Sequence, residues 1–263
     1  MSMFEHKTVK IPDCKFCISP SQIGKFYADT PLWYQEEVLG DRQFHGNTAT
    51  LLGTICHFIY DHVAKDMDVT REQIQKELAD HLANSPDLIT EVDINDILES
   101  YPAISMQVVN DYILPAKMIG KIASEVSMNL KIAEGIYLAG TCDAVYLSDA
   151  TNEYKIVDYK TVAKKPSSMV IPRTYKLQLM AYAYMLRETQ KVPVTQISIV
   201  YGIKPQKTIP ARCIAICEDI TGDMWDDIEN TIQLIADCVS LSWSKPELNY
   251  LIFKDYRLKE NHV

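Results

Sequence analysis

The stretch Ile156-Val157-Asp158-Tyr159-Lys160-Thr161 decides how this chain is interpreted. Its apolar and β-branched residues predict a strand, along which side chains point alternately to opposite faces. Asp158 and Lys160 therefore share one face of the strand, and Val157 and Tyr159 share the other. A carboxylate and an ammonium group at a strand end can hold a divalent cation and a water molecule side by side. An isolated Asp-x-Lys pattern is more often an ordinary exposed strand with alternating charges.

A second carboxylate lies upstream, in Gly140-Thr141-Cys142-Asp143. The surrounding residues 136–147 form an apolar run that predicts a strand, where an unpaired charge is costly. Hairpin order would place Asp143 beside Asp158, and two neighbouring carboxylates repel unless a cation lies between them. Mg²⁺ or Mn²⁺ suits such an oxygen-rich site. A simple turn position is the alternative explanation of Asp143.

The remaining periodicity places these strands in an α/β fold. We expect further strands over residues 122–132, 155–160, 195–203 and 211–217, and helices over 174–190 and 220–241. In the first half we expect an edge strand over 7–11, helices starting at Ser19 and Thr70, a helix over 48–65, and another over 93–117 that breaks around Pro102. The prediction is a mixed central β-sheet flanked by helices, with a largely helical N-terminal half. Residues 1–120 would form a helical region packed on a core of residues 121–263.

Composition and targeting signals exclude several classes of protein. The chain has 263 residues, of which 47% are hydrophobic, so it can bury a sizeable core. No apolar run approaches the ~20 residues of a membrane span, and the first residues lack the pattern of a signal peptide. Seven scattered cysteines indicate reduced thiols. We therefore expect a cytoplasmic protein with no membrane partner.

Charge is distributed unevenly along the chain. The net charge is −9, yet residues 155–215 hold eleven Lys and Arg against two acidic residues. Residues 65–99 hold ten acidic residues against three basic ones. This asymmetry suggests a cationic face for a polyanion on an acidic body. An ordinary basic surface beside an acidic helical one is the alternative.

Two polar residues of the predicted 174–190 helix share one face. Gln178 and Tyr182 are four residues apart, which places them one turn from each other. Glutamine can bind a phosphate, a sugar or a base edge, and tyrosine can stack or donate a hydrogen bond. An ordinary amphipathic helix explains them equally, because the chain contains 15 tyrosines.

In combination, these patterns resemble the RecB-type branch of the PD-(D/E)XK nuclease superfamily. Gly-x-x-Asp at 140–143, Asp-x-Lys at 158–160 and Gln-x-x-x-Tyr at 178–182 occur in the family's order. Ser19-Pro20-Ser21-Gln22-Ile23 with Trp33-Tyr34 is similar to the family's opening helix, and Gly53-Thr54-Ile55-Cys56-His57 to its Gly-Thr-x-x-His helix. The resemblance covers about residues 19–184 and implies a restriction-endonuclease-like sheet.

The resemblance also implies a role for each matched residue. His57, Asp143, Asp158 and the Tyr159 backbone carbonyl would be the metal ligands, and Lys160 would be the catalytic lysine acting with the two aspartates. Glu125 matches a glutamate often found ahead of Gly-x-x-Asp, although a surface strand residue is an equal alternative. Asp61, one helical turn after His57, would orient the imidazole. Gln178 and Tyr182 would contact DNA near the scissile phosphate. Independently of the resemblance, the basic segment 155–215 surrounds these motifs, and its cations would line the track of the DNA backbone: Lys164, Lys165, Arg173, Lys176, Lys204, Lys207 and Arg212.

The activity implied is Mg²⁺- or Mn²⁺-dependent hydrolysis of DNA phosphodiesters. The enzyme would be a deoxyribonuclease, either an exonuclease or an enzyme that processes single-stranded or duplex ends and flaps, in recombination, repair or replication. The cell would be a bacterium or a phage-infected host. The chain lacks the G-x-x-x-x-G-K-[ST] motif of motor proteins, so any helicase or recombinase would be a separate partner.

Departures from the family leave alternatives open. The opening helix lacks the cysteine of the iron–sulfur members, and Cys213, Cys217 and Cys238 lack their tight spacing, so no cluster is expected. The single pair in Cys14-Lys15-Phe16-Cys17 is a poor zinc site. Two other functions are open: a catalytically degenerate DNA-binding or assembly protein on the same fold, and a structural protein whose acidic half binds a partner.

Overall fold

The computed structural model describes residues 11, 13–40, 48–83 and 91–245. Within these ranges one mixed six-stranded sheet runs in the order β1-β3-β4-β5-β6, with β2 paired to β3. The strands are β1 (Phe16–Ile18), β2 (Gly120–Ala133), β3 (Ile136–Ser148), β4 (Tyr154–Val162), β5 (Val194–Ile203) and β6 (Arg212–Asp219). β4 and β5 are parallel and are connected by α7 (Arg173–Gln190), whereas β2–β3, β3–β4 and β5–β6 are antiparallel.

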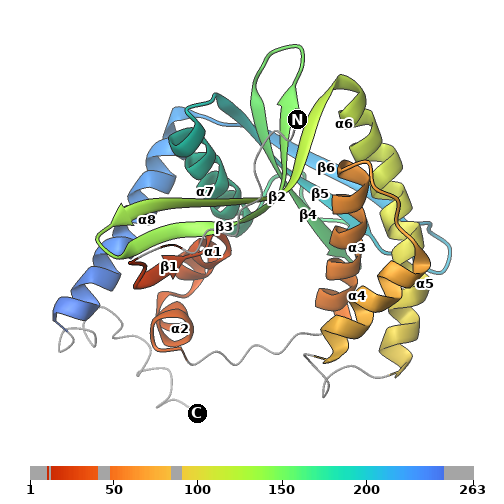
Figure 1. Ribbon diagram of the computed structural model, residues 1–263, viewed down its shortest axis with the longest axis horizontal. Helices are drawn as coiled ribbons and strands as arrows, with labels where there is room; N and C mark the ends of the chain where they lie inside the picture. Colours follow the sequence, from red (N-terminus) through yellow and green to blue (C-terminus); the bar gives the residue numbers. More distant parts are fainter. Residues whose placement is uncertain (1–10, 12, 41–47, 84–90, 246–263) are drawn as a thin grey trace.

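The helices form two layers, one on each side of the sheet (Figure 1). α1 (Pro20–Ala28), α7 and α8 (Gly222–Ser244) pack on one side, in a core that includes Ile156, Leu177 and Ile232. α3 (Thr48–Ala64), α4 (Arg71–Ala83) and α5 (Glu91–Val108) pack on the other side, in a second core. The short helices are α2 (Thr30–Trp33) and α6 (Leu114–Ile119), and π-helical turns cover Tyr34–Val38 and Val109–Ile113.

The alternation predicted for β4 matches these two cores. Val157 and Tyr159 are buried in the core under α3 and α5. Asp158 and Lys160 lie on the opposite face, where α7 packs, because successive side chains of a strand alternate. The predicted mixed sheet with flanking helices is therefore confirmed. The proposed division into residues 1–120 and 121–263 stays a prediction, and β1 of the first region pairs with β3 of the second.

Two predictions about the first half differ from the structure. α5 runs without interruption through Pro102, so the expected break there is wrong. Proline removes one backbone hydrogen bond, but Ile97, Ile104 and Val108 of this helix are fully buried, and their packing holds the helix together. The predicted edge strand over 7–11 falls outside the described residues except for Ile11, which is not in a strand. The short strand β1 was not predicted.

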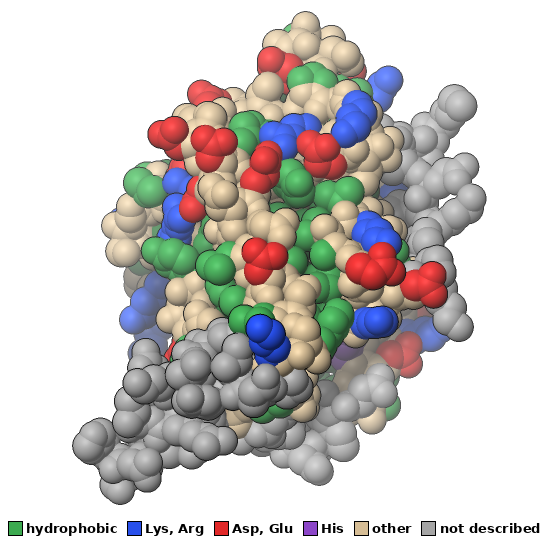
Figure 2. Space-filling view, turned by 90° about the vertical axis from the view of Figure 1, so that its left-hand side faces the viewer, with side chains coloured by type: hydrophobic (Ala, Val, Ile, Leu, Met, Phe, Trp, Pro, Cys, Tyr) green, Lys and Arg blue, Asp and Glu red, His purple; other side chains and the backbone are tan. Residues whose placement is uncertain are grey.

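The surface around α8 has no single sign of charge. Figure 2 shows acidic and basic side chains mixed with hydrophobic ones on the side of the molecule where α8 lies in Figure 1. The cationic face expected from the sequence is therefore not on this side of the molecule. In the part of the chain that the structure describes, none of the helices combines the length and the apolar character of a membrane span.

Candidate metal centre and active site

The candidate site lies where β4 separates from β3. β2 occupies one edge of β3 along its length, so β1 and β4 share the other edge. On that edge β1 pairs with Ile136–Leu138 and β4 pairs with Ala144–Leu147. Asp143 lies directly before the segment paired with β4. Beyond the fork, backbone groups on the β3 side of β4 have no partner among the described strands. Side chains form hydrogen bonds with these groups instead.

Tyr159 provides the backbone groups that two site residues bind. Its N–H donates to Oδ2 of Asp143 at 2.8 Å, and its carbonyl lies 2.8 Å from Nε2 of His57. A carbonyl only accepts, so Nε2 of the imidazole carries the proton that it donates. Burial lowers the pKa of His57 and outweighs the opposing effect of the nearby Asp158 charge, which favours the neutral ring. The Nδ1 lone pair is then free.

That lone pair faces a carboxylate. Nδ1 of His57 lies 3.6 Å from Oδ2 of Asp143. Two acceptor atoms facing each other are unfavourable unless a proton or a cation lies between them. A histidine that donates one ring N–H to a backbone carbonyl and offers the other nitrogen is the usual arrangement of a metal ligand. The surroundings of His57 therefore fit metal binding through Nδ1.

Glu125 on β2 completes a group of three donors. Ligand atoms of His57, Glu125 and Asp143 all lie within 4.8 Å of one another. Glu125 lies between the pairs Ser124↔Ala144 and Val126↔Cys142, opposite Asp143. Its φ of 50° is unusual for a residue with a side chain. Such backbone strain costs about 1–3 kcal/mol and is concentrated at functional sites.

The electrostatics of this group favour a cation. Burial, followed by the charge of Asp158, raises the pKa of Asp143 to about 8 from an ordinary value of 3.8. Burial and the neighbouring Asp143 also raise the pKa of Glu125. Crowded carboxylates prefer protons when no other positive charge is present, and a divalent cation would replace those protons. One imidazole and two carboxylates suit Mn²⁺ or Mg²⁺.

Asp158 is buried and interacts with Lys160 and Gln178. It is only 3% exposed, and its Oδ1 accepts hydrogen bonds from Lys160 Nζ and Gln178 Nε2, both at 3.0 Å. Its Oδ2 lies 2.8 Å from Lys160 Nζ. Asp158 is not part of the three-donor group, so its role as a ligand stays a prediction. Its position indicates instead that it holds the lysine.

Lys160 keeps its proton in this setting. Burial alone lowers the pKa of the ammonium group, but the charge and hydrogen bond of Asp158 outweigh burial and raise it. Lys160 therefore presents a fixed positive charge beside the candidate metal group. Gln178, on α7, donates to the same Oδ1 of Asp158 that accepts from Lys160.

Tyr182 and Gly140 belong to the packing that supports the site. The Tyr182 hydroxyl donates to the Thr141 carbonyl at 2.7 Å, and its side chain is buried. A Cβ on Gly140 would lie 2.8 Å from Pro20 and 3.3 Å from the Tyr182 hydroxyl. The glycine of Gly-x-x-Asp therefore lets α1 and α7 approach β3. Direct contact of Gln178 or Tyr182 with DNA stays a prediction.

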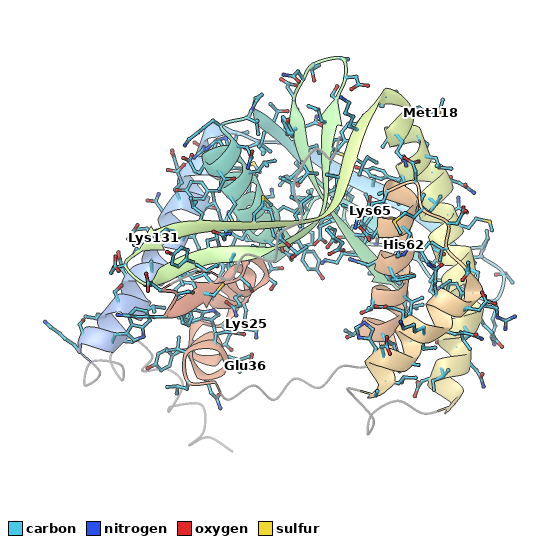
Figure 3. All side chains as sticks on the ribbon, in the orientation of Figure 1. Lys25, Glu36, His62, Lys65, Met118 and Lys131 are labelled. Atoms are coloured by element: carbon cyan, nitrogen blue, oxygen red, sulfur yellow. The ribbon has the colours of Figure 1, made fainter. Side chains whose placement is uncertain are left out.

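The other predicted positions have partners of their own. The Asp61 carboxylate accepts from Ser124 and pairs with Lys65, near the end of α3 (Figure 3), and neither His57 nitrogen contacts it. Asp61 therefore supports the junction of α3 and β2 rather than the imidazole. The Tyr159 carbonyl accepts from His57, so its predicted role as a ligand is not visible here. Among the basic residues, Arg173 pairs with Asp227, Lys176 with Glu218 and Lys204 with Asp96, whereas Lys164 and Lys165 are exposed.

The role of Glu125 cannot be assigned from the sequence, because its position depends on a β-bulge. The pairs Ala133↔Ile136 and Lys131↔Tyr137 differ by one position in register, so Ile132 is an extra residue in β2. Without that extra residue the hairpin would place Glu125 opposite Ala144. The bulge places Glu125 opposite Asp143 instead. No residue pattern in the sequence predicts this bulge.

Comparisons with known proteins identify the family and the fold. The family model of the PD-(D/E)XK nuclease superfamily matches residues 17–237. A crystal structure of a "putative exonuclease" from Eubacterium rectale superposes with a TM-score of 0.54 and 14% identity, over 91% of this chain and 86% of that one. The structure of LHK-Exo in complex with dAMP gives a TM-score of 0.34 and 11% identity, over 92% and 94% of the two chains. A search of curated proteins found no match.

The first of these structures supports the shared fold, and the second is too dissimilar to carry an argument. The family model spans most of the sequence, from β1 to α8, and so includes every residue of the candidate site. The chain therefore belongs to the PD-(D/E)XK nuclease superfamily.

Proposed function

We propose that the protein is a metal-dependent deoxyribonuclease that hydrolyses phosphodiester bonds at DNA ends, as an exonuclease or an end- or flap-processing enzyme. The observation that carries the proposal is the convergence of His57, Glu125 and Asp143 within 4.8 Å, beside a lysine that is held by a buried carboxylate. Packing alone does not explain why three side chains that can ligate a cation, two of them carboxyl groups with raised pKa values, lie next to a fixed ammonium group.

The cation would be held by His57 Nδ1 and by carboxylate oxygens of Asp143 and Glu125. When bound, Mg²⁺ or Mn²⁺ supplies Lewis-acid polarisation of the phosphate and a water of lowered pKa. The Tyr159 carbonyl fixes the imidazole, and the Tyr159 N–H fixes one oxygen of Asp143. The backbone of a single β4 residue therefore orients two of the three donors before substrate arrives.

Lys160 would stabilise the charge that develops on the phosphate. An ammonium group has three N–H donors, and Asp158 does not use all of them. The remaining donor can bind a phosphate oxygen or the attacking water, where a fixed charge is worth more than in bulk solvent. Because its pKa is raised, Lys160 acts as a cation and hydrogen-bond donor rather than as a general base.

The DNA backbone would follow the exposed cations after β4. Lys164 and Lys165 lie in the segment between β4 and α7 and are exposed. Contacts to phosphates alone give affinity that falls with salt and carry little sequence information. We therefore propose cleavage without sequence specificity.

A cleavage panel tests the proposal. End-labelled single-stranded, duplex and flap DNA is incubated with the protein and Mn²⁺, Mg²⁺ or EDTA, and the product ladders show activity and direction. We expect cleavage with either cation and none with EDTA. Lys160→Met should abolish cleavage while leaving DNA affinity within a few-fold. Lys131→Met, at the far end of the β2–β3 hairpin, is the matched control and should cleave normally (Figure 3).

Two results would reject the proposal. If no substrate is cut with either cation although the protein binds DNA, the function is that of a binding or assembly protein on this fold. If the Lys160→Met protein cuts as fast as wild type, the chemistry lies elsewhere in the molecule.

A further inference from the structure

Tyr175 is an aromatic residue beside the candidate site to which the proposed chemistry assigns no role. It lies in the first turns of α7, three residues before Gln178, and therefore on the same face of the helix. The Lys160 ammonium nitrogen lies 5.2 Å from the centre of its ring. The side chain is 36% exposed, which is high for a tyrosine placed between a helix and a sheet.

Tyr175 contacts a cation and is also partly open to solvent. The Lys160 ammonium group lies over its ring, and Tyr201, the partner of Lys160 in the β4–β5 register, is buried. Among the exposed residues shortly before α7 are the apolar Met169 and Val170. The surface beside the lysine therefore includes a partly exposed aromatic ring.

This combination is the chemistry of binding to unpaired nucleic acid. Proteins that bind single strands place aromatic rings, on which bases stack, next to cations that follow the phosphates. Stacking is tolerant of sequence, because every base has a π face. A phosphate at Lys160 would leave a base, one sugar away, within reach of a ring that already touches this lysine.

We propose that Tyr175 is a stacking platform for a base of the strand that is cut. The inference rests on the proposed nuclease function and adds to it the form of the substrate. A base inside a duplex has both faces covered by its neighbours, so a base on Tyr175 is either in a single strand or at a frayed end. The substrate at the site is therefore an unpaired strand, and its bases are held without regard to their identity.

A double-substitution cycle tests the proposal. Single-stranded oligonucleotides carry one abasic position at each place near the cut, and kcat/KM is measured for wild type, Tyr175→Leu and Tyr175→Phe with Mn²⁺. In wild type we expect an abasic penalty on the order of 5- to 100-fold at one position, because stacking of one base is worth about that much. Tyr175→Phe keeps the ring and should keep the penalty. Tyr175→Leu should cut intact and abasic strands alike.

A matched control is available on the same helix. Tyr184 also has a cation against its ring, the guanidinium of Arg187 at 5.3 Å, but it faces Glu229 of α8 instead of the site. Tyr184→Leu should retain the full abasic penalty. Circular dichroism and thermal unfolding of each variant show that it is folded.

The outcomes separate the inference from the proposed function. If Tyr175→Leu slows intact and abasic strands by the same factor, the ring only positions Lys160 and the stacking proposal is wrong. If wild type shows no abasic penalty at any position, the proposal is also wrong. If the protein cuts no DNA, the nuclease proposal fails, and the same cycle on binding, by fluorescence anisotropy with Ca²⁺, decides the role of Tyr175 on its own.

Discussion

Replacing Asp143 with asparagine should make the metal-free protein more stable, although it removes a candidate ligand. Burial and the charge of Asp158 raise the pKa of Asp143 to about 8, while the unfolded chain keeps the ordinary value of 3.8. At neutral pH, folding must therefore take up a proton that the unfolded chain has released. Asparagine requires no proton, and its side-chain oxygen can still accept the Tyr159 N–H.

The magnitude follows from the two pKa values. One pKa unit corresponds to about 1.4 kcal/mol, so the roughly three units between the unfolded value and pH 7 correspond to about 4 kcal/mol. The Asp143 side chain is 18% exposed, so water relieves part of this penalty. We expect Asp143→Asn to raise the free energy of unfolding by about 2–4 kcal/mol in EDTA at pH 7.

The sign of the pH dependence is also determined. A carboxyl group whose pKa is raised on folding destabilises the protein only above the unfolded pKa, and the penalty grows until the pH passes the folded pKa. The advantage of Asp143→Asn should therefore be small near pH 4, should grow through the range from 4 to 8, and should be constant above it. Between pH 6 and pH 7.5 we expect growth of roughly 1–2 kcal/mol.

Urea denaturation followed by circular dichroism, in EDTA at pH 6 and pH 7.5, measures these differences. Asp226→Asn, at an exposed position of α8, is the control and should change stability by less than about 0.5 kcal/mol. Adding Mn²⁺ should reverse the order, because it stabilises wild type by binding the folded state. The reasoning is refuted if metal-free Asp143→Asn is less stable than wild type at pH 7.5, or if its advantage does not change with pH.

Two further predictions concern the support of the site. Gly140→Ala should destabilise the protein by about 1–3 kcal/mol in urea denaturation, because the new carbon would lie 2.8 Å from Pro20. An unchanged urea midpoint would show that the close contact between α1 and β3 does not depend on glycine at this position. Gln178→Leu should lower kcat roughly 10-fold with little change in KM, because it removes the hydrogen bond that fixes Asp158, whereas a change in KM alone would indicate that Gln178 binds substrate.

Elements with a strong local pattern were predictable from the sequence. The helix expected over 48–65 is α3 (Thr48–Ala64), and the strand expected over 136–147 is β3 (Ile136–Ser148). The hydrophobic pattern of these segments is regular over many residues, so the local sequence and the tertiary packing favour the same secondary structure. By contrast, β1 has three residues, and it exists only because β3 offers an unpaired edge.

The candidate site was only partly predictable, because its geometry depends on long-range register. The order of Asp143, Asp158 and Lys160 along a hairpin brings them together, and sequence patterns are sufficient to show this. The arrangement of the side chains around the site is not visible in the sequence. It depends on the extra residue at Ile132, which sets Glu125 opposite Asp143, and on the fork between β3 and β4.

Hydrogen bonds determine how the two aspartates of the site are held. Asp158 has the same residue type as Asp143 and lies on the adjacent strand, but Lys160 and Gln178 both donate to its Oδ1. Whether a carboxylate holds a metal or a lysine depends on which donors surround it, and the donor from α7 is 20 residues away in the sequence. The sequence motifs predict that both aspartates lie at the site, but they do not predict which groups each carboxylate binds.

The proposed activity requires His57, Glu125 and Asp143 to bind one divalent cation together. A crystal soaked in Mn²⁺, with diffraction recorded at the manganese absorption edge, tests it directly. We expect an anomalous peak within bonding distance of one atom from each of these three side chains, and loss of the peak in Asp143→Asn. Absence of a peak there at saturating Mn²⁺, or a peak that Glu125 and His57 do not contact, would contradict it.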